Sequence, residues 1–322
     1  MIRVGIVGYG NIGKGAALAV KAAPDMELCA IFTRRDPGSI NAPEGISVFS
    51  VTDALSKTSD IDVMVLCGGS ATDLPEQGPH FAKHFNIVDS FDTHAKIPDY
   101  LASVDAVAKN KTAVIASGWD PGLFSLMRVF SEAVLPNGST YTFWGKGVSQ
   151  GHSDAIRRIE GVKNAVQYTI PVDAAVETVR SGQSPVFETR EKHLRECFVV
   201  ADETADRNLI EKTIKEMPNY FSDYDTTVHF TDESELLRSH SKMPHGGLVM
   251  RSGVTDSANS HVIEFSLALE SNPEFTASII VAYARAAYRL AQEGKYGAKT
   301  VFDIPPAYLA EKSRAEIIRE LL

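Results

Sequence analysis

The sequence predicts an α/β protein with a doubly wound parallel sheet, followed by a second domain of the α+β class. Three observations support this fold class. A short apolar segment, Ile2 to Val7, leads into a glycine-rich turn. Strand-like and helix-like segments then alternate as far as about residue 122. After Gly122, several strand-like segments show the two-residue alternation that is typical of antiparallel sheets.

The glycine-rich turn, Gly8-Tyr9-Gly10-Asn11-Ile12-Gly13, has the G-x-G-x-x-G spacing of dinucleotide-binding sites. Gly8 permits a tight turn, Gly10 lets a pyrophosphate approach the backbone, and Gly13 lets the next helix pack against the strand. The start of that helix offers N–H groups and a partial positive charge to phosphates. Because the motif joins a predicted strand to a predicted helix, we expect a Rossmann-type nucleotide site rather than a purely structural turn.

Four more strands are expected in the first domain, with helical spacing between several of them. The strands are Met26 to Phe32, Ile61 to Cys67, Asn86 to Asp89 and Thr112 to Ala116, and the helices are Pro75 to His84 and Pro98 to Asn110. Ligands of parallel sheets bind beyond the carboxyl ends of the strands. We therefore expect one ligand edge, made by Gly8 to Gly13, Thr33 to Arg35, Gly68 to Ser70, Ser90 to Asp92 and Ser117 to Asp120.

The second domain is expected to hold several strands and a helix over Ala205 to Met217. Its strands are Thr140 to Trp144, Ala165 to Ile170, Leu194 to Val200, Thr226 to Phe230, Leu248 to Arg251 and Val262 to Leu269. A long helix over Phe275 to Glu293 follows. We place the dinucleotide-binding domain at residues 1–122 and the second domain at 123–271, and we expect residues 272–322 to return to the first domain.

The composition excludes several classes of protein. A formal net charge of −9 argues against nucleic acid as a partner. No apolar run is long enough for a membrane helix, and no basic leader precedes the first strand. The three cysteines are widely spaced and form neither a disulfide framework nor a metal pattern. We therefore expect a cytoplasmic protein without a bound metal.

The end of the second strand indicates which nucleotide is bound. It reads Thr33-Arg34-Arg35, and the first acidic residue, Asp36, comes after both arginines. A carboxylate at the tip of this strand would repel a 2′-phosphate, whereas arginine offers it charge and a planar set of donors. We therefore expect NADP as the cofactor. The alternative is that the two arginines form only a solvated turn.

Several unusual segments resemble those of the meso-diaminopimelate dehydrogenase family. They are VGYGNIGKG, FTRRD, GSATDLPEQGP, SGWDPGLFS, FWGKGVSQGHSDAIRRI, RECFVVAD, MPHGG and NPEFTAS. The likeness extends from Met1 beyond Tyr283, whereas the tail after about Lys295 carries no motif and its role stays open. The resemblance implies an NADP-dependent homodimer that pairs through its second domain.

The resemblance also implies the reaction. Such enzymes oxidatively deaminate the D-centre of meso-2,6-diaminopimelate and release ammonia. The other product, L-2-amino-6-oxopimelate, cyclises to tetrahydrodipicolinate. The reverse reaction is a reductive amination that belongs to the biosynthesis of lysine and of a cell-wall precursor.

The glycine turn and the resemblance together name the residues of both ligand sites. The cofactor-binding positions are Gly8, Tyr9, Gly10, Asn11, Ile12, Gly13, Thr33, Arg34, Arg35, Cys67, Gly68, Gly69, Ser70, Ser90, Phe91 and Asp92. The substrate-binding positions are Asp92, Asp120, Trp144, Gln150, Gly151, Thr169, Arg195, His245 and Asn272. We add Trp119, which would shield the reacting centre from water.

Two aspartates suit the catalytic step. Hydride leaves the α-carbon only when the neighbouring amine is neutral, and water must later attack the imine, so both steps call for a positioned proton acceptor. Asp92 and Asp120 each follow a predicted strand at the cofactor edge. We expect both to bind the reacting amino group, and which of them accepts the proton stays open. Either could instead be a turn or helix-cap aspartate.

The two substrate carboxylates require cationic or donor-rich partners. Arg195, in a strand-like segment, suits a bidentate contact with the distal carboxylate, unless it only faces solvent. His245 lies beside two glycines that permit close backbone approach, although a loop histidine is often only solvated. Asn272 precedes Pro273, which suggests a helix cap, and a helix N-terminus also attracts a carboxylate.

Trp144 and the loop after it indicate a polar wall, although Trp144 could also be a core residue. The adjacent His152-Ser153-Asp154 is expected to begin a helix, since contiguous residues do not reach the geometry of a catalytic triad. Two other functions remain open. One is a different two-domain NADP oxidoreductase of amino-acid metabolism, such as dihydrodipicolinate reductase. The other is a non-catalytic NADP-binding sensor.

Overall fold

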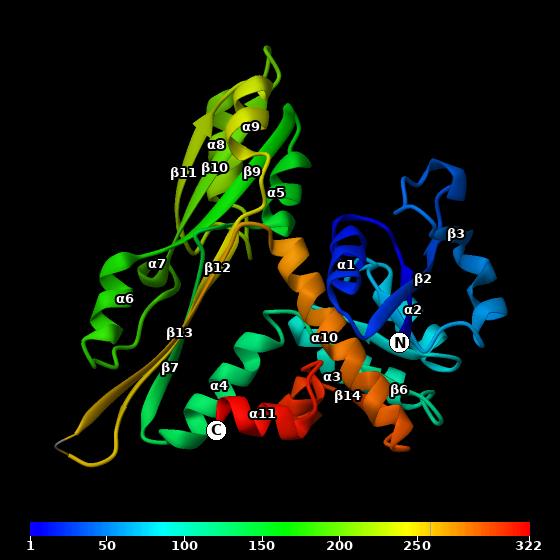
Figure 1. The fold of residues 1–322 in the computed structure, drawn as a ribbon. Coiled ribbons are helices and arrows are strands. Elements are labelled where there is room, and N and C mark those ends of the chain that lie inside the picture. The colour runs from blue at the N-terminus through cyan, green and yellow to red at the C-terminus, as the bar shows by residue number, and fades with distance from the viewer. Residues whose placement is uncertain (258) are drawn as a thin grey trace. The chain divides into compact units, whose positions relative to one another are not determined.

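The chain forms two compact units, which a computed structural model describes for residues 1–257 and 259–322. The first unit comprises residues 1–126 and 273–322, and the second comprises residues 127–272. The chain first passes from the first unit to the second within the helix α4 (Leu123–Val134). In Figure 1 the first unit carries the blue and cyan elements together with the orange and red ones.

The first unit contains a parallel sheet of seven strands in the order β14-β6-β5-β4-β1-β2-β3. The strands are β1 (Ile2–Val7), β2 (Met26–Thr33), β3 (Ser47–Ser50), β4 (Val63–Leu66), β5 (Asn86–Asp89), β6 (Thr112–Val114) and β14 (Gly297–Lys299). The predicted doubly wound parallel sheet is confirmed. The pattern missed β3 and β14 because each is short and only partly buried.

The first unit also contains helices, in addition to the first residues of α4. They are α1 (Asn11–Ala22), α2 (Leu74–Ala82), α3 (Ile97–Asp105), α10 (Asn272–Gln292) and α11 (Arg314–Leu321). Short 3₁₀ turns lie at Pro37–Ser39, Val51–Lys57, His94–Lys96, Val301–Asp303 and Pro306–Tyr308. The prediction was wrong in extending the third helix to Asn110, because helical structure ends at Asp105 and a turn leads into β6.

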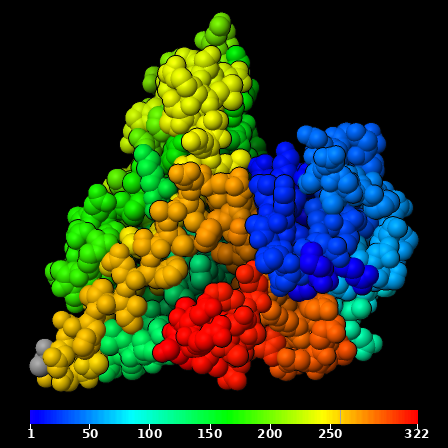
Figure 2. All heavy atoms as spheres, in the orientation of Figure 1, coloured from blue at the N-terminus to red at the C-terminus, as the bar shows by residue number. Residues whose placement is uncertain are grey.

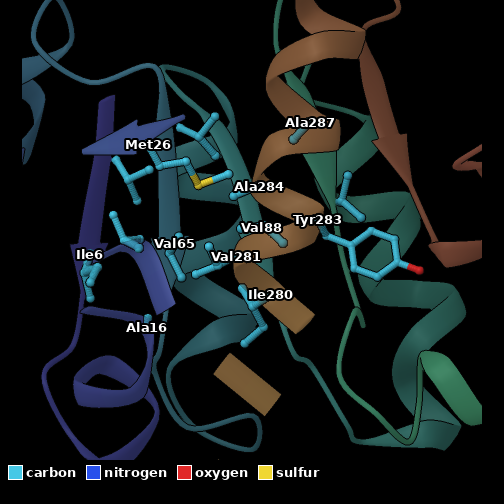
Figure 3. Packing of buried hydrophobic residues seen from close by; sticks show 14 of the residues in the cluster. Ile6, Ala16, Met26, Val65, Val88, Ile280, Val281, Tyr283, Ala284 and Ala287 are labelled. Carbon is cyan, nitrogen blue, oxygen red and sulfur yellow. The ribbon is translucent and has the colours of Figure 1, made fainter. Parts of the chain in front are cut away.

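The long helix α10 packs against the sheet through its apolar side. Figure 3 shows Ile280, Val281 and Ala284 of this helix facing buried residues of the sheet. On the first helix, Gly15 has no room for a side chain, since a Cβ atom there would lie 2.9 Å from the Cβ of Ala277. The close approach of α1 and α10 therefore requires a glycine at this position.

The C-terminal segment also belongs to the first unit. Figure 2 shows it in red against the orange surface of α10. The Arg289 guanidinium donates to the carbonyl of Ala310 at 2.7 Å, and the Tyr308 hydroxyl bonds Glu293 at 2.6 Å. The strand β14 pairs with β6 at the edge of the sheet. The tail therefore completes the first unit.

The second unit combines helices with two sheets, which confirms the predicted α+β class. One sheet has the order β11-β10-β9-β8, and the other has the order β13-β12-β7. The strands are β7 (Gly138–Trp144), β8 (Gly147–Val148), β9 (Val162–Pro171), β10 (His193–Ala201), β11 (Asp225–Phe230), β12 (His245–Val254) and β13 (Ser260–Leu269). The β10–β11 pair is parallel because the helix α8 (Arg207–Lys215) connects the two strands.

The remaining helices of the second unit are α5 (Gln150–Arg157), α6 (Asp173–Arg180), α7 (Thr189–Lys192) and α9 (Glu233–His240). Within the described ranges, no helix of either unit is both long and apolar enough to cross a bilayer.

Candidate functional site

The glycine-rich turn has the backbone that the motif predicts. Gly8 adopts a left-handed conformation with φ +89°, and a side chain at Gly13 would overlap the carbonyl oxygen of Gly8. At Gly10 an added Cβ would meet nothing within 4 Å. Gly8 and Gly13 are therefore required by the turn itself. Gly10 faces open space at the start of α1.

Thr33 is the last residue of β2, and two arginines follow it at the same edge of the sheet. The Thr33 hydroxyl accepts from the backbone N–H of Arg35 at 3.1 Å, and the Arg35 guanidinium donates to the carbonyl of Tyr9 at 2.8 Å. The Arg34 guanidinium pairs with the Asp73 carboxylate at 2.9 and 3.0 Å, yet its side chain stays 66% exposed. The edge thus presents two cations, one held by the glycine turn and one by the start of α2.

The segment Cys67 to Ser70 follows β4 and is fixed by its neighbours. The backbone N–H of Gly69 donates to Asp73 at 3.0 Å. The Ser70 hydroxyl accepts from the backbone N–H of Asp92 at 2.6 Å, which joins this loop to the one after β5. Burial raises the pKa of the Cys67 thiol to about 12, so this thiol is neutral at physiological pH.

The two candidate catalytic aspartates lie on loops that leave the adjacent strands β5 and β6. Asp92 is exposed, and Asp120 is half-buried in the turn from Trp119 to Gly122. Trp119 is buried and packs edge-on against Phe124, with ring centroids 5.2 Å apart. Adjacent parallel strands bring both loops to the edge that carries the glycine turn.

Ser90 and Phe91 complete the loop that carries Asp92. Ser90 is half-buried. Phe91 is 1% exposed and stacks on Tyr100, with ring centroids 4.2 Å apart. The Phe91 side chain therefore belongs to the core, and only its backbone can face a ligand.

Arg195 is a buried cation in the second unit. It is opposite Thr169 in the antiparallel pair β9–β10, and its guanidinium donates to the Thr169 hydroxyl. The Tyr224 ring lies 3.8 Å from the guanidinium carbon, so the cation stacks on an aromatic face. Among the residues that the structure describes, no carboxylate lies within ion-pair distance of Arg195, and its Nε atom has no hydrogen-bond partner.

Burial lowers the pKa of Arg195, because a charge held away from water is costly. A carboxylate ligand would offset that cost, so the environment of Arg195 suits an anionic group. Gln167, on the same strand as Thr169, is fully buried and leaves its amide oxygen Oε1 without a partner. Sequence reasoning did not identify Gln167 or Tyr224.

Trp144 is held by a histidine that sequence reasoning also missed. The backbone N–H of Trp144 donates to Nε2 of His193 at 2.8 Å, and the two rings stack with centroids 5.4 Å apart. Burial and the nearby Arg195 lower the pKa of His193 to about 3, so its imidazole is a neutral acceptor. The sequence signal was a polar residue at a buried position of the alternating strand β10.

Gln150 and Gly151 begin α5, and both lie at least partly in solvent. His152, Ser153 and Asp154 follow in the same helix, as expected, and form no nucleophilic triad. Nδ1 of His152 lies 2.5 Å from the hydroxyl of Ser149. Burial and the charge of Arg195 lower the pKa of His152 to about 4.

His245 and Asn272 lie at the starts of two elements. His245 begins β12, and a side chain at Gly147 would lie 2.5 Å from the imidazole of His245. Asn272 donates its backbone N–H to the carbonyl of Met243 at 2.9 Å. It is the first residue of α10, so the helix begins at the predicted cap residue, one position before Pro273. No group of three or more His, Cys, Asp and Glu side chains in the described ranges is arranged for a metal ion.

Comparisons with known proteins identify the family. The diaminopimelic acid dehydrogenase C-terminal domain matches residues 118–271. A meso-diaminopimelate D-dehydrogenase from Ureibacillus thermosphaericus is 64% identical, over 100% of this chain and 99% of the relative.

Two solved structures are also similar over the whole chain. One is a substituted meso-diaminopimelate dehydrogenase from Clostridium tetani with diaminopimelate, with TM-score 0.96, 53% identity and 100% of both chains covered. The other is an engineered D-amino acid dehydrogenase bound to NADP⁺, with TM-score 0.87, 42% identity, and 100% of this chain and 99% of that chain covered. The chain belongs to the meso-diaminopimelate D-dehydrogenase family of oxidoreductases.

Proposed function

We propose that this chain catalyses the NADP-dependent oxidative deamination of meso-2,6-diaminopimelate at its D-centre. The products are L-2-amino-6-oxopimelate, which cyclises to tetrahydrodipicolinate, and ammonia, and the reverse reaction is a reductive amination. The observation that carries the proposal is 64% identity over the full length of a meso-diaminopimelate D-dehydrogenase.

The edge of the parallel sheet fits NADP. Gly10 leaves room for the pyrophosphate, and Arg34 and Arg35 supply the charge that a 2′-phosphate requires. The loops Cys67 to Ser70 and Ser90 to Asp92 complete the proposed cofactor set, in which Phe91 contributes its backbone. When bound, the nicotinamide accepts the hydride from the α-carbon. NADP⁺ in the engineered relative, which is 42% identical, supports this assignment.

Asp92 and Asp120 bind the reacting amino group. A carboxylate there orients the ammonium, and one of the pair removes its proton before hydride leaves. Trp119 limits the access of bulk water to the reacting carbon. The position of both aspartates on adjacent strand tips supports this role.

The second unit binds the rest of the substrate. Arg195 and Thr169 hold the distal carboxylate, and Trp144, Gln150, Gly151, His245 and Asn272 form the remaining contacts. The buried and carboxylate-free setting of Arg195 supports this role. The Clostridium tetani protein provides further support, because its six substituted positions have the residue types and chain spacings of Gln150, Thr169, Arg195, Pro244, His245 and Asn272 here.

Stereochemical selection follows from these contacts. Only the meso isomer presents a D-centre for oxidation together with an L-centre for the distal residues. The L,L or D,D isomer leaves buried polar groups unpaired, which is how donor-rich sites reach large discrimination.

We also propose that the enzyme is a cytoplasmic homodimer that pairs through the second unit. Exposed apolar side chains on α4 support this surface: Val129, Phe130 and Val134 are 50%, 61% and 52% exposed. The strand β13 is a sheet edge. The three unpaired cysteines support a reducing compartment. Light scattering of the purified protein tests the dimer, and a monomeric mass would contradict it.

The test of the reaction measures absorbance of the reduced nicotinamide with the meso, L,L and D,D isomers, each with NADP and with NAD. We expect reduction only with the meso isomer and NADP, together with release of ammonium. Activity that neither releases nor requires ammonia would indicate a reductase of another kind. Cofactor binding without any turnover would favour a sensor.

A further inference from the structure

A single buried residue joins the two loops that carry Asp92 and Asp120. Asp89 is the last residue of β5 and is fully buried. Its carboxylate oxygen Oδ1 accepts from the backbone N–H of Phe91 at 3.0 Å and from that of Ala116 at 3.1 Å. Its backbone carbonyl accepts from the N–H of Ser117 at 3.0 Å and from the hydroxyl of the same serine at 2.8 Å. The loops after β5 and β6 are thus fixed to one another.

The bond to Ala116 stabilises an unusual backbone. Ala116 has φ +53°, a left-handed conformation that costs a residue with a side chain about 1 kcal/mol or more. This residue turns the chain out of β6 toward Trp119 and Asp120. The Asp89 carboxylate compensates for that cost by accepting the N–H of Ala116.

The other oxygen of Asp89 is held by Tyr100. The Tyr100 hydroxyl donates to Oδ2 at 2.6 Å, and its ring stacks on Phe91. Gly78 of α2 makes room for this hydroxyl, since a side chain there would overlap it. Burial raises the pKa of Asp89 to about 6, although its three donors favour the charged form. Within the described residues, no cation lies within ion-pair distance of this carboxylate.

We infer that Asp89 is a positioning residue for the reaction: by binding the Phe91 and Ala116 amides, it sets the separation of Asp92 and Asp120. The inference rests on the proposed function. An apolar side chain would fill the same core without the cost of burying a carboxylate, so the acceptor serves the two loop amides. Asp89 does not touch the substrate and acts only through the loops.

The test compares Asp89→Ala, Asp89→Asn and Tyr100→Phe. Asp89→Ala removes all three acceptor contacts, and we expect kcat for meso-diaminopimelate to fall by about 100-fold, as misplaced catalytic groups do. Asp89→Asn keeps an oxygen for Phe91 and Ala116, so it should recover most of this loss. Tyr100→Phe removes only the third donor, and it should lower the melting temperature while changing kcat far less than Asp89→Ala.

Hydrogen exchange provides a readout that does not depend on activity. Without ligands, segments 90–94 and 115–122 should exchange faster in Asp89→Ala than in Tyr100→Phe. If the wild-type protein does not turn over meso-diaminopimelate, the proposed function fails, and hydrogen exchange still decides whether Asp89 ties the loops.

Three results would overturn the inference. One is a folded Asp89→Ala protein with wild-type kcat. Another is an equal loss of kcat and equal loop exchange in Asp89→Ala and Tyr100→Phe, which would make Asp89 a core residue only. If Asp89→Ala does not fold, the comparison uses Asp89→Asn, whose kcat and loop exchange should be close to those of Tyr100→Phe. A much larger loss of kcat in Asp89→Asn with unchanged loop exchange would show that the charge, not the loop tie, matters.

Discussion

Asp89 in the first unit and Arg195 in the second unit are both buried charges, and the surroundings of the two differ. Asp89 in the first unit receives hydrogen bonds from Tyr100 and from two backbone amides of its own chain. Arg195 in the second unit has Thr169 and the face of Tyr224, but no carboxylate within the described residues. A buried charge that its own chain satisfies holds the fold, whereas one left without a counter-ion is available to a ligand.

Two glycines of the turn also differ in whether the chain itself fills the space around them. Gly13 is surrounded by its own chain, so a side chain there would overlap the Gly8 carbonyl oxygen. Gly10 faces open space. The fold therefore requires a glycine at position 13, whereas a side chain at position 10 would meet no atom of the protein.

Replacing Arg195 tests the contrast most strongly. Arg195→Met keeps a similar volume and removes the cation, so we expect kcat/KM for meso-diaminopimelate to fall about 100-fold or more, near 3 kcal/mol. Affinity for NADP should stay unchanged. Because an unpaired buried charge is costly, the melting temperature should stay equal or rise. Steady-state kinetics and thermal unfolding measure both.

Asp89→Ala is the matched control, because it removes a charge that the chain satisfies and should lower the melting temperature. If Arg195→Met destabilises the protein as much as Asp89→Ala does, the two buried charges do not differ in kind. Unchanged substrate kinetics in Arg195→Met would remove Arg195 from the site.

The second prediction concerns the cations at the end of β2. Arg34→Ala combined with Arg35→Ala should raise KM for NADP by about 30-fold, near 2 kcal/mol, because charged hydrogen bonds to the 2′-phosphate are lost. KM for NAD should change much less. An equal loss for both cofactors would mean that the arginines only shape the turn.

The third prediction concerns His193, whose neutral imidazole accepts a hydrogen bond from the backbone N–H of Trp144. Its folded pKa of about 3 lies below the ordinary value of 6.5. Such an imidazole stabilises the fold fully above pH 6.5, and this stabilisation is lost as the pH falls from there toward 3. His193→Gln keeps an acceptor for Trp144 but does not titrate.

The variant should therefore lose less stability than the wild type between pH 6.5 and 4, by up to about 1.4 kcal/mol per pH unit. Urea unfolding at several pH values measures this slope. His152 keeps its own contribution in both proteins. An identical slope in the two proteins would contradict the neutral, buried state of His193.

The smallest effect is expected at Gly10. Gly10→Ala should leave the melting temperature nearly unchanged and weaken NADP binding by about 1 kcal/mol, since the methyl group enters the space for the pyrophosphate. Gly13→Ala is the control and should destabilise the fold itself. If Gly10→Ala binds NADP as the wild type does, the open space beside Gly10 is not the phosphate site.

The sequence predicted what depends on local pattern. The turn at Gly8 to Gly13 and the parallel sheet were recognisable because glycine spacing and apolar runs are local signals. The surroundings of Arg195 could not be recognised from the sequence. They arise from the pairing of β9 with β10 and from Tyr224, which lies 29 residues further along the chain. His193 and Asp89 escaped notice for the same reason, because each acts through partners brought together only by folding.

The strand β14 has a consequence for how the protein is made. It consists of residues 297–299, yet it lies beside β6 in the sheet that begins at Ile2. During synthesis the ribosome must therefore release the chain as far as Lys299 before this sheet is complete. Until then β6 is an edge strand, and its unpaired backbone N–H and C=O groups can pair with other nascent chains, which is a route to misassembly. A truncation of the last 30 residues would make that hazard permanent.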